Sequence, residues 1–170
     1  VLPIVRELAA AKSRRDALDF GDQVALAARL AAEFPDVGAA ERGRFRAVLL
    51  DEFQDTSEAQ LAFLHGVFVA DGESVPVTAV GDPHQAIYGW RGASATTLDR
   101  YTALFRDPDP ATVLPLSTSW RNDEAILASA NVVAEPLVAS SRIPVRRLAA
   151  RPTAGTGHVL TARLETIEEE

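Results

Sequence analysis

Residues 48–56 read VLLDEFQDT, an apolar run that ends in two adjacent carboxylates. A continuous apolar run is typical of a strand covered on both faces of a parallel sheet, and residues 47–50 predict such a strand. Ligands of open α/β sheets bind outside the carboxyl ends of the strands, so Asp51 and Glu52 are candidates to face a nucleotide or metal ion. Taken alone, the pair is equally typical of a polar strand end that only caps a helix.

Strands and helices alternate along the chain, which predicts an α/β fold. We expect strands at residues 47–50, 75–80, 112–116 and 158–164. We expect helices at residues 1–13, 22–34 (capped by Asp22 and ended by Pro35), 39–44, 57–68 (capped by Ser57), 94–105 and 122–134 (capped by Asn122 or Asp123). The proline-containing segment 107–110 is the expected domain boundary.

Composition narrows the class of protein. The chain has 170 residues, a net charge of -7 and no cysteine, which excludes disulfides and thiolate metal sites within it. No apolar run is long enough to span a bilayer, so we expect no membrane partner, and the absence of cysteine is compatible with a reducing cytoplasm. The negative charge argues against a free-standing DNA-binding domain but not against a motor that tracks DNA, because net charge averages over faces. The arginines of residues 142–151 are interpreted as a solvated surface rather than a phosphate site.

A second motif, GDPHQAIYGWRGA, occupies residues 81–93 and again follows a predicted strand. Gln85 is a neutral donor and acceptor, suited to sensing a phosphate oxygen or a water. Tyr88 and Trp90, with Arg91 beside them, form a candidate platform on which bases stack without sequence preference. Packing in a core is the alternative for these aromatic rings.

A third motif, LSTSWRN, occupies residues 116–122. Arg121 lies between a predicted strand and a predicted helix, where its guanidinium can reach an anion held by a neighbouring lobe. Trp120 is a candidate to stack on a nucleotide base. In isolation this motif is better explained by a surface salt bridge and a packed tryptophan.

Together, the three motifs in this order resemble motifs II, III and IV of superfamily 1A DNA helicases, the UvrD/Rep/PcrA group. Residues 18–22 (LDFGD) resemble the segment in which these helicases re-enter their first motor lobe. The resemblance covers residues 18–131 and implies a P-loop NTPase fold with RecA-like lobes, in which a parallel sheet is flanked by helices. It implies three domain parts: the end of a helical insertion (1–17), the C-terminal part of the first lobe (18–108) and the start of the second lobe (109–170).

The resemblance also implies ATP and Mg²⁺ as cofactors and a role for each matching residue. Asp51 binds Mg²⁺, and Glu52, near the metal, activates the attacking water. Gln85 and Arg121 contact the γ-phosphate, and Trp120, where a tyrosine is common, stacks on adenine. The DNA-binding residues implied are Tyr88, Trp90 and Arg91.

Three elements of the family are absent from this sequence: the phosphate-binding loop and the later motifs V and VI. The phosphate-binding loop has the pattern Gly-x-x-x-x-Gly-Lys-Ser/Thr, whereas Lys12, the only lysine, lies in Ala-Lys-Ser without the glycines. We therefore expect a central piece of a 3′→5′ DNA helicase, inactive in isolation, whose partners are single-stranded DNA, single-strand/double-strand junctions and the rest of the helicase chain. Two alternatives stay open: the motor of an AdnAB- or RecBCD-type helicase–nuclease, with a nuclease or repair partner, and a non-catalytic DNA-binding scaffold.

Overall fold

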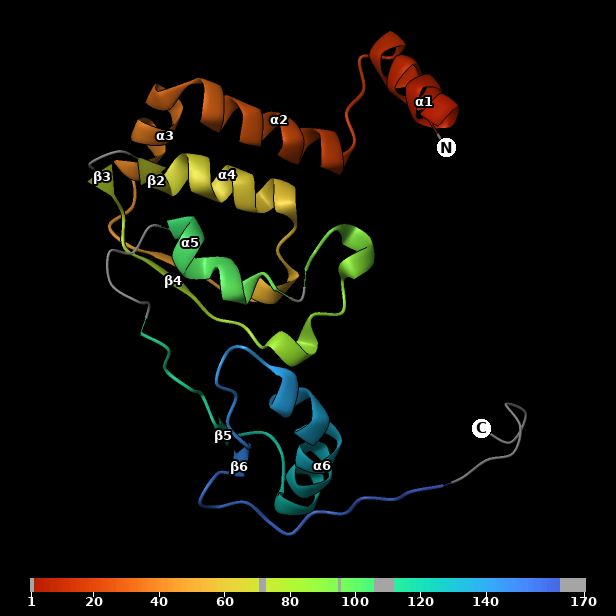
Figure 1. The fold of residues 1–170 in the computed structure, drawn as a ribbon, viewed down its shortest axis with the longest axis vertical. Helices are drawn as coiled ribbons and strands as arrows, with labels where there is room; N and C mark the ends of the chain where they lie inside the picture. The colour runs from red at the N-terminus through yellow and green to blue at the C-terminus, as the bar shows by residue number, and fades with distance from the viewer. Residues whose placement is uncertain (1, 71–72, 95, 106–111, 163–170) are drawn as a thin grey trace. The chain divides into compact units, whose positions relative to one another are not determined.

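The computed structural model describes residues 2–70, 73–94, 96–105 and 112–162. The chain divides into two compact units, Val1–Ala111 and Thr112–Glu170. The predicted boundary segment 107–110 lies outside the described residues. Each unit mixes helices with short strands, as an α/β fold requires (Figure 1).

The first unit begins with three helices. They are α1 (Leu2–Arg14), α2 (Phe20–Glu33) and α3 (Pro35–Arg42). The predicted cap of α2 was wrong by three residues: Asp19 is the N-cap, and Asp22 is the third helical residue of a reciprocal capping box. Helix α3 starts at Pro35, four residues earlier than expected, because the fixed φ of proline suits the first helical position.

The central part of the first unit is a pair of parallel strands, β1 (Val48–Leu50) and β4 (Val77–Ala79). Between them lie the 3-10 turn η1 (Phe53–Asp55), helix α4 (Glu58–Phe68) and the antiparallel pair β2 (Val69–Ala70) and β3 (Glu73–Ser74). Ser57 caps α4 as predicted, in a capping box with Gln60. The parallel pairing was also predicted correctly, but Leu49 is exposed, so β1 is not covered on both faces by the described residues.

Short turns complete the first unit. They are η2 (Pro83–Gln85), η3 (Gly89–Arg91), η4 (Leu98–Arg100) and α5 (Tyr101–Phe105). The single helix expected over 94–105 was wrong. The hydroxyl of Ser94 accepts a hydrogen bond from the Thr96 amide, and such local side-chain bonds compete with helix formation.

The second unit contains β5 (Thr118–Ser119), helix α6 (Glu124–Ser140) and β6 (Ala149–Ala150), with β5 parallel to β6. The strand expected at 112–116 was wrong: the chain there is irregular, and the strand forms where β6 provides a partner. Residues 158–162 are likewise irregular, and residues 163–164 of that predicted strand lie outside the described part. Helix α6, with Asp123 as its N-cap, continues six residues beyond the expected end and through Pro136. Within the described residues, no helix is long and apolar enough to cross a membrane.

Helix α4 packs against α2 and against the β1–β4 pair. Figure 1 shows α2 alongside α4, and their close approach depends on small residues. A Cβ atom added at Gly66 in α4 would lie 2.9 Å from the Cβ of Ala31 in α2, so no larger residue fits there without a shift. One core cluster joins Ala31, Val67 and Phe68, and a second joins Phe53, Leu61 and Phe105.

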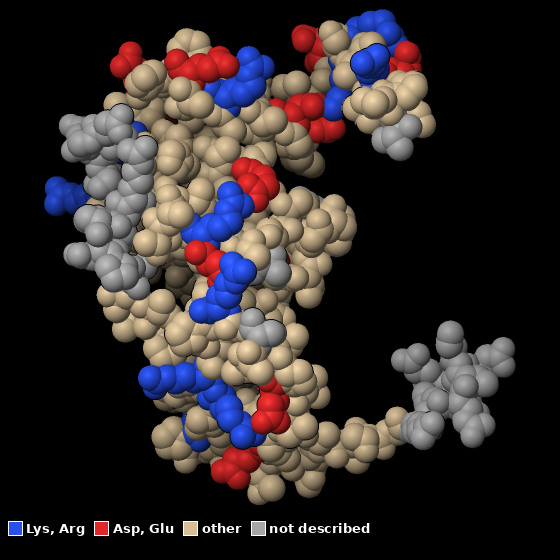
Figure 2. Space-filling model, in the orientation of Figure 1, with Lys and Arg blue, Asp and Glu red and all other residues tan. Residues whose placement is uncertain are grey.

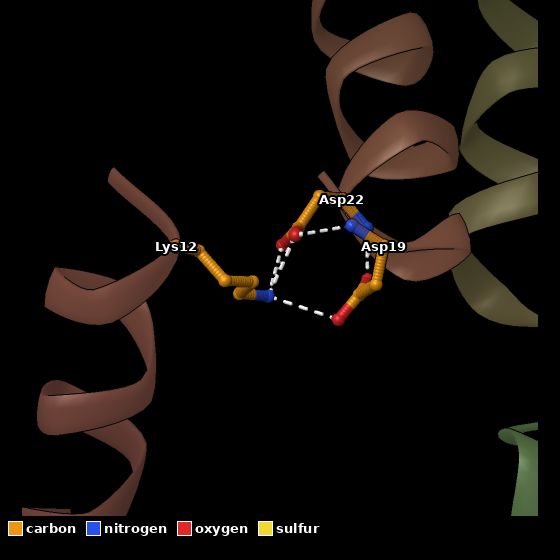
Figure 3. A network of polar contacts seen from close by, with 3 residues as sticks. All are labelled: Lys12, Asp19 and Asp22. Carbon is orange, nitrogen blue, oxygen red and sulfur yellow. Dashed lines mark hydrogen bonds and ion pairs between the residues drawn. The ribbon is translucent and has the colours of Figure 1, made fainter. Parts of the chain in front are cut away.

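Lys12 connects α1 to the capping box of α2 (Figure 3). Its ammonium group donates to Asp22 at 2.6 and 2.8 Å and to Asp19 at 2.9 Å. The hydrogen bonds that Lys12 donates to Asp22, and then the one to Asp19, raise the pKa of Lys12. The backbone N–H of Asp22, and then the Lys12 ammonium, lower the pKa of Asp19. The one lysine of the chain therefore has a structural role, because its ion pairs tie α1 to the start of α2.

We expect Lys12→Gln to loosen α1 from α2, because a neutral amide cannot satisfy two carboxylates. Chymotryptic cleavage near the exposed Phe20 should accelerate about two- to fivefold, the size of effect expected when a partly exposed network of ion pairs is lost. Arg14→Gln is the matched control, because Arg14 pairs with Glu7 within α1. Equal acceleration in the two variants would contradict the assignment.

The direction of the two pKa shifts sets the pH dependence of this tie. The lowered pKa of Asp19 means that its contribution is present above the ordinary carboxyl pKa and is lost as the pH falls through the lowered value. The raised pKa of Lys12 means that its contribution is complete below the ordinary lysine pKa and is lost as the pH rises through the raised value. The tie is thus intact across the neutral range.

Candidate nucleotide and DNA site

The parallel pairing of β1 and β4 brings two sequence motifs to one edge. Leu50 pairs with Ala79 in the register, so both strands end at the same level. The Val80 amide donates to the Leu50 carbonyl at 2.7 Å, and the Phe53 amide donates to the Val80 carbonyl at 2.9 Å. The acidic pair after β1 and the Gly-Asp dipeptide after β4 therefore leave the sheet side by side.

Asp51 and Glu52 are both exposed at this edge. The Asp51 carboxylate accepts the Glu52 amide at 2.9 Å. Glu52 has φ 50° and ψ 38°, a left-handed conformation that costs about 1–3 kcal/mol in a residue with a side chain. Such strain persists only where the surroundings fix it, and here the turn is fixed by Phe53, whose side chain is fully buried.

The donor chemistry at this edge fits Mg²⁺. The ion takes oxygen ligands and is commonly held by one or two carboxylates together with substrate phosphates. Asp51 and Glu52 supply two exposed carboxylates. Among the described residues no group of three or more His, Cys, Asp or Glu side chains could hold a metal ion, so phosphate oxygens and waters would have to complete the ligand set.

Gln54 joins the two motifs and was missed as a site residue by sequence reasoning. Its side chain is 1% exposed. Its Nε2 donates to Glu52 Oε2 at 2.7 Å, and its Oε1 accepts the Asp82 amide at 3.1 Å. The sequence signal was present, since Gln54 stands inside the quoted motif, but its burial depends on the strand pairing.

Gln85 lies at the end of η2, exposed, beside the same edge. Its Nε2 donates to Asp82 Oδ2 at 2.8 Å, while Asp82 Oδ1 accepts the His84 amide at 2.9 Å. Asp82 thus orients the candidate phosphate sensor, a role that the sequence did not suggest. The structure brings Asp51, Glu52 and Gln85 to one strand edge through Gln54 and Asp82.

The two aromatic residues of the second motif follow on η3 and its cap. The ring centroids of Tyr88 and Trp90 are 6.1 Å apart with the ring planes at 57°. Trp90 is 74% exposed and Tyr88 is half-buried, so Trp90 is not a core residue in this structure. Gly92, at φ 84°, ends the turn in a conformation that favours glycine. The side chain of Arg91 lies outside the described part of the chain.

The third motif is in the second unit, between β5 and α6. Trp120 is 73% exposed, and Arg121 is exposed and forms no ion pair with any described residue. The turn is held by Arg151, which donates to the carbonyl of Trp120 at 3.2 Å and to the Asp123 carboxylate at 3.2 Å. Arg151, interpreted from sequence as part of a solvated cluster, therefore stabilises the turn that presents the motif.

Charge on the surface is mixed rather than segregated. Figure 2 shows basic and acidic side chains interspersed on the visible face of the described residues. Several arginines pair with nearby carboxylates: Arg14–Glu7, Arg29–Glu33, Arg44–Glu41, Arg100–Glu58 and Arg151–Asp123. The aromatic pair is consequently a better candidate for contact with nucleic acid than any basic stripe on this face.

The first unit is thus a mixed α/β fold in which acidic motifs follow the two parallel strands β1 and β4. Residues 2–106 match the family described as UvrD/REP helicase N-terminal domain. This chain therefore belongs to the UvrD/REP helicase family.

Three relatives illustrate the similarity. The chain is 35% identical over 122 residues to the ATP-dependent DNA helicase UvrD1 of Mycobacterium tuberculosis, a match that covers 69% of this chain and 15% of the relative. It is 34% identical over 122 residues to DNA helicase II of Escherichia coli, covering 72% and 16%. It is 32% identical over 121 residues to the ATP-dependent DNA helicase PcrA of Staphylococcus aureus, covering 71% and 16%. The chain thus spans a small part of the length of these relatives.

We expect Phe53→Ala to lower the free energy of unfolding of the first unit by about 3–5 kcal/mol, because it leaves a cavity under the strained Glu52 turn. Urea denaturation measures the effect. Phe20→Ala is the control, since the Phe20 ring is exposed and its loss should cost little. Similar losses in the two variants would contradict the anchoring role of Phe53.

Proposed function

We propose that the protein containing this chain is an ATP-dependent 3′→5′ DNA helicase or translocase, which couples ATP hydrolysis to tracking along single-stranded DNA and unwinding of duplex. One observation carries the proposal. The Glu52 carboxylate and the Asp82–Gln85 turn, from two motifs separated in sequence, meet at the carboxyl edge of two parallel strands through the buried amide of Gln54. Membership of the UvrD/REP helicase family supports it.

The proposed ATP site assigns a role to each polar group at this edge. Asp51 holds the Mg²⁺ ion that accompanies the nucleotide. Glu52 orients the attacking water and accepts a proton from it. Gln85, held by Asp82, contacts the γ-phosphate or that water. When bound, Mg²⁺ neutralises charge on the phosphate oxygens. In this proposal the first unit is part of a P-loop NTPase lobe with RecA-like architecture.

The second unit contributes to the same proposal through its third motif. Arg121 is exposed and lacks an ion-pair partner among the described residues, so its charge is available for a γ-phosphate. An arginine in that role accelerates phosphoryl transfer by roughly 10³–10⁵. The exposed ring of Trp120 is available to stack on adenine.

The proposed DNA contact is the aromatic pair Tyr88 and Trp90, with Arg91 in support. Stacking of a base on an aromatic ring contributes about 1–3 kcal/mol without sequence preference. Gln85 lies in the preceding turn η2 of the same motif, so a base that moves Trp90 in η3 acts within a few residues of the proposed phosphate sensor. Single-stranded DNA and its junctions with duplex are the proposed partners.

We expect Glu52→Gln, made in the full-length protein, to reduce the kcat of DNA-stimulated ATP hydrolysis by about 10²–10⁴, because an amide cannot accept the proton of the water. Single-stranded DNA binding, followed by fluorescence anisotropy, should be retained. Glu58→Gln is the control, as Glu58 pairs with Arg100 at the start of α4. ATP turnover at the wild-type rate in Glu52→Gln would refute the assigned role. Unwinding of substrates with a 3′ but not a 5′ single-stranded tail tests the direction of movement.

We expect Trp90→Ala to weaken binding of single-stranded oligothymidine by about 10- to 100-fold, which corresponds to the binding free energy of one stacked base. The variant should also lower the stimulation of ATP hydrolysis by DNA. Trp90→Phe should restore most of both, because a stacking ring remains. The DNA-independent hydrolysis rate serves as the internal control and should not change. Unaltered DNA affinity in Trp90→Ala would eliminate the stacking role.

A further inference from the structure

Gln54 occupies an unusual position for a polar side chain. It is 1% exposed, yet both ends of its amide have partners that belong to different motifs. Nε2 donates to Glu52 at 2.7 Å and faces Asp55 at 3.4 Å, while Oε1 accepts the main-chain amide of Asp82 at 3.1 Å. A buried side-chain amide needs hydrogen-bond partners, but any nearby polar groups could provide them. Here the partners come from two different candidate functional motifs.

The chemistry of the partners fixes the orientation of this amide. A main-chain N–H can only donate, so the atom that faces Asp82 is the oxygen. The carboxylates of Glu52 and Asp55 only accept, so the atom that faces them is the nitrogen. Rotating the amide by 180° would place its oxygen against two carboxylates and its nitrogen against a donor. The amide therefore has one stable orientation, with a donor aimed at Glu52.

The space around Oε1 is equally restricted. A Cβ atom added at Gly81 would lie 2.5 Å from Gln54 Oε1, closer than such atoms approach in proteins, and 3.2 Å from the main-chain nitrogen of Gln54, which is a tight contact. Any side chain at position 81 must displace the amide or the strand end. Gly81 is thus required for the approach of Gln54 to Asp82 and not for an unusual φ.

The contact extends from Asp82 to Gln85. Asp82 presents its amide to Gln54 and its carboxylate to Gln85 at 2.8 Å. A displacement of the Gln54 amide consequently acts on Glu52 directly and on Gln85 through one residue. Positional errors of about 1 Å in such groups reduce turnover by roughly 10²-fold.

We propose that Gln54 is a positioning residue that fixes the Glu52 carboxylate and the Asp82–Gln85 turn relative to each other, and that Gly81 provides the space this requires. The kinetic part of the inference rests on the proposed function. The structural part, the bond from the Asp82 amide to Gln54, does not.

Two variants of the full-length protein test the inference by different routes. Gln54→Met keeps the length of the side chain and removes both hydrogen bonds. Gly81→Ala keeps the glutamine at position 54, but the added Cβ displaces the amide of that side chain. This variant provides the test if Gln54→Met fails to fold. The controls are Gln23→Met, on the exposed surface of α2, and Gly43→Ala, where an added Cβ has only ordinary contacts of 3.5 and 3.6 Å.

The measurements are steady-state ATP hydrolysis and hydrogen–deuterium exchange in the peptide that contains Asp82. We expect both test variants to lower kcat by about 10- to 100-fold while KM for ATP changes less than about threefold, because the nucleotide still binds but the reacting groups are misplaced. Exchange at the Asp82 amide should accelerate up to about tenfold, the equivalent of one lost hydrogen bond. The control variants should match the wild type in both measurements.

Two results would overturn the inference. Faster exchange at Asp82 with kcat within about threefold of the wild type would make Gln54 a merely structural core residue. Unchanged exchange in both variants would show that the bond from Asp82 to Gln54 does not hold the turn. If the wild-type protein does not hydrolyse ATP, the proposed function fails instead, and the exchange measurement still decides the structural part.

Discussion

The parallel pairing of β1 with β4 sets the position of the polar groups that the first unit contributes to the candidate ATP site. Its register aligns Leu50 with Ala79, and the chain leaves both strands at one edge. A slip of one residue would turn each side chain to the opposite face and separate Gln54 from Asp82. Because each strand has only three residues, the pairing is supported mainly by the helix and turns packed on it.

Hydrophobic burial provides that support. Phe53, Leu61 and Phe105 form a buried cluster, and Leu50 and Ala79 from the two strands pack against it. Phe53 is the residue after Glu52, so the same cluster that stabilises the sheet also holds Glu52 in its left-handed conformation. The strain at the candidate catalytic residue is therefore offset by burial of its neighbour, which is a common arrangement at functional sites.

Sequence patterns predicted the elements whose signals are local. The Ser57 cap and the apolar strand before Asp51 agree with the structure. Predictions that depended on a partner elsewhere in the chain were less successful. The strand expected at 112–116 instead forms at Thr118–Ser119, where β6 pairs with it, and Leu49 is exposed although its apolar neighbours predicted burial. The predicted N-cap of α2 was wrong for another reason. Asp19 and Asp22 both suit an N-cap, and only the hydrogen-bond geometry distinguishes them.

The sequence by itself determined the family of this protein, because the family match over residues 2–106 is a property of the chain alone. It also supplied the candidate side chains for a metal ion or water (Asp51 and Glu52), for a phosphate (Gln85 and Arg121) and for a base (Trp90). Only the tertiary structure decided that Gln54 and Asp82 connect the first two motifs and that Arg151 holds the third. The physical reason is that the bonds of the buried Gln54 amide and of the Arg151 guanidinium join residues 28 and 31 positions apart, and no local pattern encodes such a contact.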